Sequence, residues 1–215
     1  MIRIVIADDH RLMREGLRQL VGAGKGMQVV GEATNESEVM SHVRSSSFDV
    51  LLLDLSMPGG SGVELIRRVR NESPSPAVLV LTMHDERLYA VRAIRAGALG
   101  YLTKETAVTD VLRAIEQVAE GRPYISEKFS EELAHSIMNP SPDALHSRLT
   151  DRELQVFMKI VAGDTLNDVA DALYLSVKTV SAHKTRILQK MEMRNVTELV
   201  QYAILHGMLS RTILH

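Results

Sequence analysis

The first 120 residues alternate short apolar runs with segments of helical periodicity, and this alternation restricts the fold more than any other feature. Five runs rich in Val, Ile and Leu have the length of buried strands, and apolar residues recur every three or four positions after each run. The predicted strands are 2–7, 28–33, 50–54, 77–82 and 99–103, and the predicted helices are 12–21, 37–43, 63–69, 88–96 and 108–119. The pattern predicts an α/β domain with a five-stranded, doubly wound parallel sheet.

Polar residues stand at the carboxyl ends of four of these runs: the pair Asp8-Asp9, then Asp54, Thr82 and Lys104. Because the carboxyl ends of parallel strands meet at one edge of a sheet, we expect these side chains to lie together. Each residue alone has a simpler explanation. Loop acids and a lysine form solvated ion pairs, and an aspartate before a Pro-Gly turn caps that turn. The convergence of all of them favours a functional site.

Three carboxylates at one edge repel each other unless a cation lies among them. Oxygen ligands suit a hard cation, and Mg²⁺ is the usual choice. Such a site suits phosphoryl transfer, in which one carboxylate is the nucleophile and Lys104 neutralises charge on the transferred group.

These residues resemble the phosphorylation site of response regulators in two-component signalling. By this resemblance Asp54 is the phosphoacceptor, Thr82 the switch hydroxyl, Lys104 the invariant lysine of the family and Tyr101 the switch aromatic residue. The resemblance implies a receiver domain of flavodoxin-like topology. It also implies that Asp54 takes its phosphoryl group from the phosphohistidine of a sensor histidine kinase.

The same resemblance implies a set of Mg²⁺ ligands. Asp8, Asp54 and the backbone carbonyl of Ser56 would bind the ion, and Asp9 would be a ligand directly or through water. Two positions depart from the commonest pattern of the family. Met83 stands where small residues are frequent, which puts the rates of phosphorylation and dephosphorylation in question, and Glu105 replaces a frequent proline.

The chain is long enough for two domains, and its turn residues predict where they separate. We expect a receiver domain over 1–120, a linker over 121–148 and a second domain over 149–215. An N-capped pattern predicts a helix at 126–138 within the linker. The Pro-rich segment that follows predicts a flexible spacer at 139–147.

The second domain is predicted to contain four helices. Thr150 and Glu153 have the spacing of a capping box that begins the first helix, and Gly163 ends it. A second helix is expected near 167–173 and a third at 177–191, joined by a tight turn, and the last is expected at 196–206. Two helices with this connection predict a helix-turn-helix that reads DNA.

The third helix divides into an apolar face and a polar face. Winding at 3.6 residues per turn places Val180, Ile187, Leu188 and Met191 in the core. We expect the contacts with DNA bases and phosphates to come from Lys178, Thr179, Ser181, Ala182, His183, Lys184, Thr185, Arg186 and Gln189. Basic residues outnumber acids along this segment, which attracts phosphate, although an ordinary charged surface helix is the alternative.

The C-terminal segment also resembles the LuxR-type helix-turn-helix of the NarL/FixJ subfamily over Leu149 to Leu209. In that family the last helix pairs two copies on DNA. Here it carries Leu199, Tyr202, Ala203 and Leu205, which predicts either a homodimer contact or packing inside the domain. A domain that is barely basic binds phosphate weakly as one copy, so the sequence favours a homodimer in the active state.

The remaining features place the protein in the cytoplasm. The chain has no cysteine, no signal peptide and no apolar run long enough to span a membrane. We therefore predict a non-enzymatic response regulator that binds promoter double-stranded DNA and controls transcription through phosphorylation of Asp54. The alternatives are a regulator that binds DNA independently of phosphorylation and, more distantly, an aspartate-nucleophile phosphatase. Such phosphatases usually present a second acid where this chain has Ser56.

Overall fold

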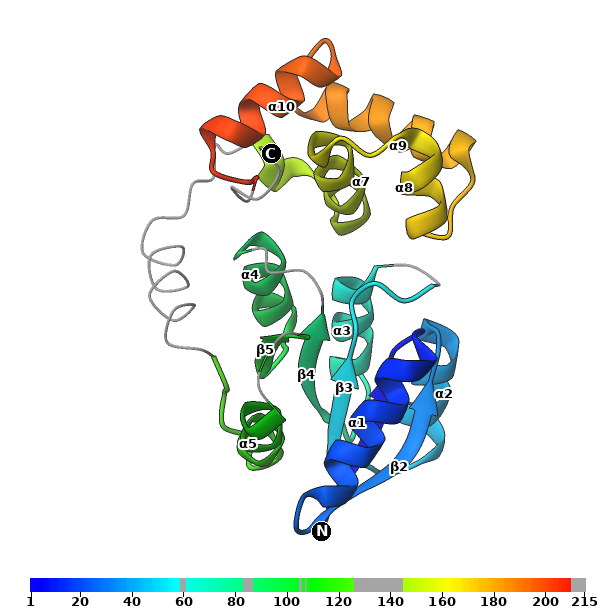
Figure 1. Ribbon diagram of the computed structural model, residues 1–215, viewed down its shortest axis with the longest axis vertical. Helices are drawn as coiled ribbons and strands as arrows, with labels where there is room; N and C mark the ends of the chain where they lie inside the picture. Colours follow the sequence, from blue (N-terminus) through cyan, green and yellow to red (C-terminus); the bar gives the residue numbers. More distant parts are fainter. Residues whose placement is uncertain (59–60, 83–86, 105, 107, 126–144, 210–215) are drawn as a thin grey trace. The chain divides into compact units, whose positions relative to one another are not determined.

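The computed structural model describes residues 1–58, 61–82, 87–104, 106, 108–125 and 145–209. The chain divides into two compact units (Figure 1). Met1–Asn139 form an α/β unit, and Pro140–His215 form a unit whose described elements are all helical. Among the described helices, none has the length and apolar character that a membrane crossing needs.

The first unit contains the five-stranded parallel sheet that the alternation predicted. From one edge to the other, the strands are β2 (Met27–Ala33), β1 (Ile2–Ala7), β3 (Val50–Leu53), β4 (Ala77–Thr82) and β5 (Gly100–Thr103). Each predicted strand is confirmed within one residue at its ends. The observed order requires crossovers between parallel strands, and the helices provide them.

Helices cover both faces of this sheet. One face carries α1 (Arg11–Ala23) and α5 (Val108–Ala119), and the other carries α2 (Glu36–Ser45), α3 (Gly62–Arg70) and α4 (Arg87–Ala96). These helices confirm the predicted helical segments. Side chains alternate between the two faces along a strand, and helices cover both faces of the central strands. Every position of β3 is therefore buried, which explains its uninterrupted run of apolar residues.

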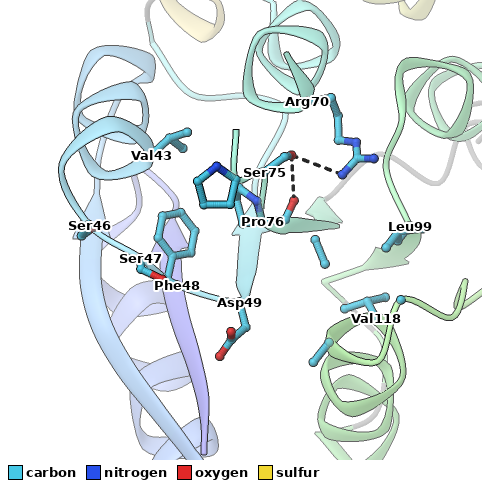
Figure 2. Close-up of a pocket in the computed structure, with 14 residues that line it drawn as sticks. Val43, Ser46, Ser47, Phe48, Asp49, Arg70, Ser75, Pro76, Leu99 and Val118 are labelled. Carbon is cyan, nitrogen blue, oxygen red and sulfur yellow. Dashed lines mark hydrogen bonds between the residues drawn. The ribbon is translucent and has the colours of Figure 1, made fainter. Parts of the chain in front are cut away.

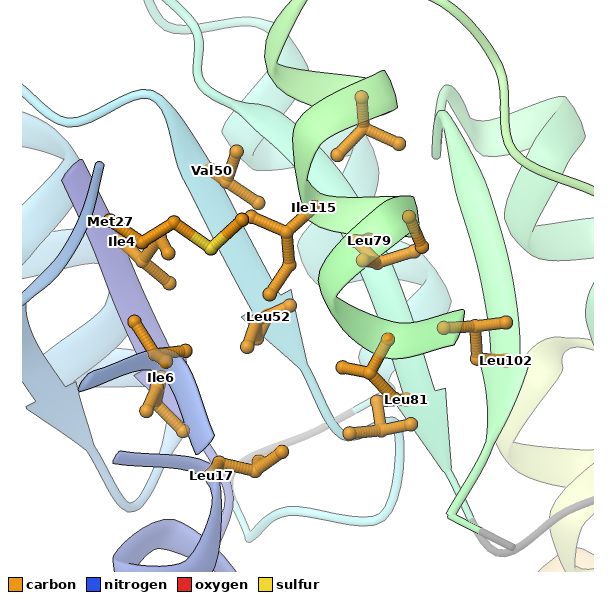
Figure 3. Packing of buried hydrophobic residues seen from close by; sticks show 14 residues of the cluster. Ile4, Ile6, Leu17, Met27, Val50, Leu52, Leu79, Leu81, Leu102 and Ile115 are labelled. Carbon is orange, nitrogen blue, oxygen red and sulfur yellow. The ribbon is translucent and has the colours of Figure 1, made fainter. Parts of the chain in front are cut away.

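The core under α1 and α5 is shown in Figure 3. It contains alternate residues of the strands, such as Ile4, Leu52 and Leu79, packed against Leu17 of α1 and Ile115 of α5. All five are at most 6% exposed. Burying an aliphatic side chain of this size stabilises the fold by about 1.5–3 kcal/mol. This core fixes the strands, and therefore the loops that follow them.

A depression of about 520 Å³ lies at the amino-terminal ends of the strands (Figure 2). Phe48 before β3, Pro76 before β4 and Leu99 before β5 line it, and at its rim Arg70 donates a hydrogen bond to Ser75 Oγ at 3.2 Å. The polar residues singled out by the sequence follow the same strands at their other ends. The depression is therefore separate from the candidate site.

The second unit contains four α-helices and a short 3-10 helix in its described part. They are η1 (Leu145–Arg148), α7 (Asp151–Ala162), α8 (Leu166–Ala172), α9 (Val177–Lys190) and α10 (Val196–Leu205). The predicted capping box is present, because Thr150 Oγ1 accepts from the Glu153 N–H while Glu153 Oε2 accepts from the Thr150 N–H. Gly163 ends α7 with a left-handed φ of 102°, as glycine does at this position.

The segment predicted as a linker differs in part from its prediction. Leu145–Arg148 fold as a 3-10 helix, whereas a flexible spacer was expected over 139–147. A contact with α10 explains why Leu145–Arg148 are folded: His146 Nδ1 lies 2.8 Å from the Tyr202 hydroxyl. The helix predicted at 126–138 lies outside the described residues. The domain limits at residues 120 and 149 stay predictions.

Candidate functional site

The carboxyl ends of the central strands bring the predicted acidic residues together. β1 and β3 are neighbours and pair in register, with Ala7 opposite Leu53. The next residue on each strand is an aspartate, so Asp8 and Asp54 emerge side by side. The Asp54 N–H donates to the Ala7 carbonyl at 2.8 Å, which extends the ladder to the site itself. Asp54 is 3% exposed and Asp8 is 1% exposed.

Lys104 reaches this carboxylate pair from the end of β5. Its Nζ lies 2.6 Å from Asp8 Oδ2 and 2.7 Å from Asp54 Oδ2, and its side chain is 3% exposed. Burial alone lowers the pKa of this ammonium group, but the hydrogen bonds and charges of Asp54 and Asp8 outweigh burial and raise the pKa above 10.5. Lys104 is therefore a buried cation shared by two anions.

The second oxygen of the Asp54 carboxylate is held by the loop that follows β3. Asp54 Oδ1 accepts a hydrogen bond from the Ser56 N–H at 3.1 Å. This contact orients the carboxylate, because the Ser56 N–H binds one oxygen and Lys104 binds the other. Ser56 thus stands beside Asp54 through its N–H, and the metal-binding role of its carbonyl stays a prediction.

Thr82 and Tyr101 lie on the two strands that follow β3 in the sheet, β4 and β5. Thr82 is fully buried, and its carbonyl accepts from the Lys104 N–H at 2.8 Å, which aligns the ends of these two strands. Tyr101 is 8% exposed and pairs with Val80 across the ladder. The ring of the predicted switch residue is therefore buried in this structure. Met83 and Glu105 lie outside the described residues.

The donor set fits a hard cation. Asp8, Asp9, His10 and Asp54 each place one ligand atom within 4.8 Å of the others. Three carboxylates at this spacing carry more negative charge than Lys104 alone offsets, and oxygen donors suit Mg²⁺. The chemistry of these side chains is therefore compatible with the predicted metal site.

Two residues at this pocket were missed in the sequence. His10 Nδ1 lies 2.9 Å from Asp9 Oδ1 and 3.3 Å from Asp8 Oδ1. Arg14 donates from Nη1 to the Asp8 carbonyl at 2.7 Å and from Nε to Glu32 Oε2 at 3.1 Å. One signal was available in the order of the chain: His10 directly follows the acidic pair and is the N-cap of α1, and Arg14 lies near the start of that helix.

In the second unit, α9 presents the predicted polar face. Lys178, Ser181, Ala182, Thr185, Arg186 and Gln189 are exposed, and Thr179, His183 and Lys184 are half-buried. Val180, Ile187 and Met191 are buried as predicted, whereas Leu188 is only partly buried. The N-terminal end of α9 begins at the Ser176 cap, where the side chain accepts from the Thr179 N–H.

Buried polar contacts fix α9 against α7. Lys190 of α9 donates to Glu153 Oε2 at 2.7 Å, and Glu153 is 3% exposed. Burial raises the pKa of this carboxyl group, but the bond from Lys190 and those from Thr150 outweigh burial and lower the pKa below 4.5. The carboxylate form of Glu153 is therefore favoured, which maintains the ion pair between the C-terminal end of α9 and α7.

His183 lies at the border between this face and the core. Burial of the imidazole is the largest effect and lowers the pKa of His183 below 6.5. The charge of Glu153 opposes this shift, and the charges of Arg186 and Arg152 add to it. Because the unfolded chain then binds the proton more readily, His183 contributes stability that is present above pH 6.5 and is lost as pH falls through the lower folded pKa. The second unit should therefore be destabilised by mild acid.

We expect His183→Gln to remove this part of the pH dependence. Urea unfolding followed by circular dichroism, at pH 7 and about one unit below pH 6.5, measures it for the parent and the variant. His206→Gln is the matched control, because His206 is exposed and its substitution leaves the His183 environment intact. An equal loss of stability in acid for the parent and His183→Gln would contradict this assignment.

Part of the apolar surface of α10 is used within the unit. Leu199, Tyr202 and Ala203 are buried, which confirms internal packing for these three residues. Leu205 is 83% exposed, and Ile204, which the sequence interpretation did not single out, is 62% exposed. The exposed apolar surface of α10 is therefore smaller than predicted and lies at its C-terminal end.

Comparisons with known proteins agree with both halves of the chain. Residues 4–116 match the response regulator receiver domain, and residues 147–203 match the bacterial regulatory proteins of the luxR family. Response regulator UvrY of Escherichia coli K12 is 34% identical over 209 residues, which cover 97% of this chain and 96% of UvrY.

The chain is a response regulator of the NarL/FixJ subfamily. Solved structures of the response regulator RcsB resemble it along most of its length. A structure of two RcsB dimers bound to two parallel DNAs has a TM-score of 0.60 and 27% identity, covering 94% of this chain and 98% of that one. RcsB from Salmonella enterica serovar Typhimurium, bound to promoter rprA with the phosphomimetic BeF3−, has a TM-score of 0.62 and 25% identity, covering 94% and 97%.

Membership of this family bears on one of the earlier alternatives, the aspartate-nucleophile phosphatase. The response regulator combines a receiver with a LuxR-type DNA-binding domain, and it acts in the control of transcription. It is not a phosphatase, in agreement with the serine that stands two residues after Asp54.

Proposed function

We propose that Asp54 of this response regulator accepts a phosphoryl group and that phosphorylation controls binding of the second unit to promoter DNA. The observation that carries the proposal is the buried cluster in which Lys104 Nζ lies within 2.7 Å of both Asp8 and Asp54. Asp54 is the nucleophile because its carboxylate follows the central strand and is oriented by both Lys104 and the Ser56 N–H.

A divalent cation belongs to this proposal. Asp8, Asp54 and the Ser56 carbonyl would hold Mg²⁺, and Asp9 would contribute directly or through water. When bound, the ion supplies charge neutralisation for the phosphoryl oxygens and the attacking carboxylate. Lys104 contributes a second positive charge at the same place, already fixed by its two buried partners.

The phosphoryl group changes the balance of charge in the pocket. The phosphoryl group carries about 1.5 to 2 negative charges where the Asp54 carboxylate carried one, and Lys104 and the Thr82 hydroxyl are its partners. Thr82 moves toward the phosphoryl group, and the space it leaves favours the buried orientation of Tyr101. A change on β4 and β5 then alters the surface formed by α4, β5 and α5.

DNA binding is assigned to the exposed face of α9. Its polar side chains reach base edges, and Lys178, Lys184 and Arg186 supply charge for phosphates. The RcsB structures contain the related protein as dimers on DNA and bound to a promoter, which supports DNA binding by this chain. Two copies bring two such faces to the DNA, and the exposed Ile204 and Leu205 of α10 are the surface we assign to their contact.

The phosphoryl donor we assign is the phosphohistidine of a sensor histidine kinase, the partner that a receiver domain implies. A small-molecule donor tests the acceptor without that partner. Incubation of the intact chain with acetyl phosphate and Mg²⁺, followed by protein and peptide mass measurement, should show one added phosphoryl group on Asp54. An unmodified chain, or modification at another residue, would contradict the proposal.

A further inference from the structure

Arg14 connects the acidic pocket to a neighbouring strand. It lies on α1, with a side chain that is 14% exposed. Its Nη1 donates to the Asp8 carbonyl oxygen at 2.7 Å, and its Nε donates to Glu32 Oε2 at 3.1 Å. Glu32 belongs to β2, so one guanidinium group joins three elements: α1, the end of β2 and the loop after β1. Arginine suits this position because its planar group donates in two fixed directions.

The Asp8 carbonyl is part of the peptide plane that joins Asp8 to Asp9. A hydrogen bond to this oxygen therefore fixes the direction in which the chain enters Asp9. The Asp8 carboxylate has separate partners, since it accepts from the His10 N–H at 2.8 Å and contacts Lys104. The Asp9 carboxylate contacts the His10 ring at 2.9 Å. Since Arg14 holds the peptide group that leads into Asp9, it acts on Asp9 through the backbone.

We propose that Arg14 is a positioning residue that, anchored by Glu32, directs the Asp9 carboxylate into the cation site. This inference rests on the proposed Mg²⁺ site and assigns a further residue to it. Arg14 does not touch the ion, and its effect passes through the peptide between Asp8 and Asp9.

The sign of the effect separates positioning from simple electrostatics. Arg14 carries a positive charge near a cation site, so removing it reduces repulsion and would strengthen Mg²⁺ binding if charge alone mattered. Loss of a positioning contact weakens binding, and residues that orient metal ligands typically change affinity by about 10–100-fold. A decrease in affinity after removal of this charge is thus specific to positioning.

The experiment is calorimetric titration of the intact chain with Mg²⁺, which does not depend on phosphorylation. We expect Arg14→Ala to lower the affinity by on the order of tenfold. Arg18→Ala is the matched control, because it removes the same charge from α1, where Arg18 contacts only the exposed Glu15 among the described ion pairs. Arg18→Ala should leave the affinity equal or slightly higher.

Two further variants make the result decisive. Arg14→Lys keeps the charge, but one ammonium group does not span both acceptors, so the Mg²⁺ affinity of this variant should also fall. If circular dichroism shows that Arg14→Ala is unfolded, Arg14→Lys takes its place. In an Asp9→Asn background, Arg14→Ala should cost much less than in the parent, since the two residues act through one contact.

Unchanged Mg²⁺ affinity in Arg14→Lys, tighter binding by a folded Arg14→Ala, or a full additional loss in the Asp9→Asn background would overturn the inference. Failure of the proposed site looks different. In that case the parent chain gives no Mg²⁺ binding, or binding that Asp9→Asn and Asp54→Asn leave unchanged. Binding that depends on Asp9 but not on Arg14 refutes the positioning role alone.

Discussion

Asp54→Asn is expected to abolish phosphorylation by acetyl phosphate while the protein stays folded. The amide has nearly the shape of the carboxylate but lacks the anionic oxygen that attacks phosphorus. Its single amide oxygen accepts from either the Ser56 N–H or Lys104, so one of these two contacts is lost, and Lys104 keeps Asp8 Oδ2 as a partner at 2.6 Å. Since no charge is left buried alone, the structural cost is small compared with the loss of the nucleophile.

Asp49→Asn is the matched control for this experiment. Asp49 precedes the same strand β3, and its carboxylate accepts from the Arg3 N–H at the opposite end of the strand. This variant removes the same charge and should be phosphorylated like the parent. Circular dichroism measures whether each variant is folded, and intact mass measures the modification. Phosphorylation of Asp54→Asn at the parent's rate would refute Asp54 as the acceptor.

Replacement of Lys178 and Lys184 by Ala should remove most DNA binding. Each lysine that neutralises a phosphate releases a counterion. The loss of two contacts therefore makes the negative slope of log affinity against log salt less steep, by about two per bound chain. The affinity itself should fall roughly tenfold to a hundredfold at physiological salt. Both residues lie on α9, where Lys178 is exposed and Lys184 is half-buried.

A control must remove the same charge elsewhere. The pair Lys25→Ala and Lys159→Ala does so, because Lys25 lies in the α/β unit and Lys159 belongs to α7, where it pairs with Asp164. Fluorescence anisotropy with labelled promoter DNA, repeated over a series of salt concentrations, gives affinity and slope together. If the control pair weakens binding as much as the α9 pair does, net charge and not the α9 face carries the DNA contact.

Much of the fold was predictable because the local sequence patterns agree with the global arrangement. The run Val50–Leu53 is apolar at every position, since helices cover both faces of the sheet. The acidic residues were predictable for a related reason. Residues that follow parallel strands arrive at the same edge, so Asp8 and Asp54 meet although 46 positions separate them in the sequence.

Contacts that depend on side-chain direction were not predictable in the same way. Arg14 contacts both the Asp8 carbonyl after β1 and Glu32 of β2 because α1 packs beside these strands, whereas an arginine on an amphipathic helix otherwise suggests a solvated residue. The bond between His146 and Tyr202 joins residues 56 positions apart and explains why 145–148 are ordered where turn composition predicted a spacer. Neither contact leaves a periodic signal in the sequence.

The sequence left two interpretations of α10 open for another physical reason. Apolar residues on a helix show which side avoids water, but they do not distinguish a partner helix of the same domain from a second copy. Leu199, Tyr202 and Ala203 pack within the unit, and Ile204 and Leu205 do not.

The central claim is that phosphorylation of Asp54 controls DNA binding, and the affinity of the intact chain for promoter DNA tests it most directly. The measurement is made at one fixed salt concentration, before and after treatment with acetyl phosphate and Mg²⁺, with Asp54→Asn as the unphosphorylated control. We predict tighter binding by the treated parent and no change for the variant, because phosphorylation shifts the equilibrium only as far as it favours the DNA-binding state. Equal affinity of the phosphorylated and unphosphorylated parent would contradict the account and would instead favour a regulator that binds DNA independently of phosphorylation.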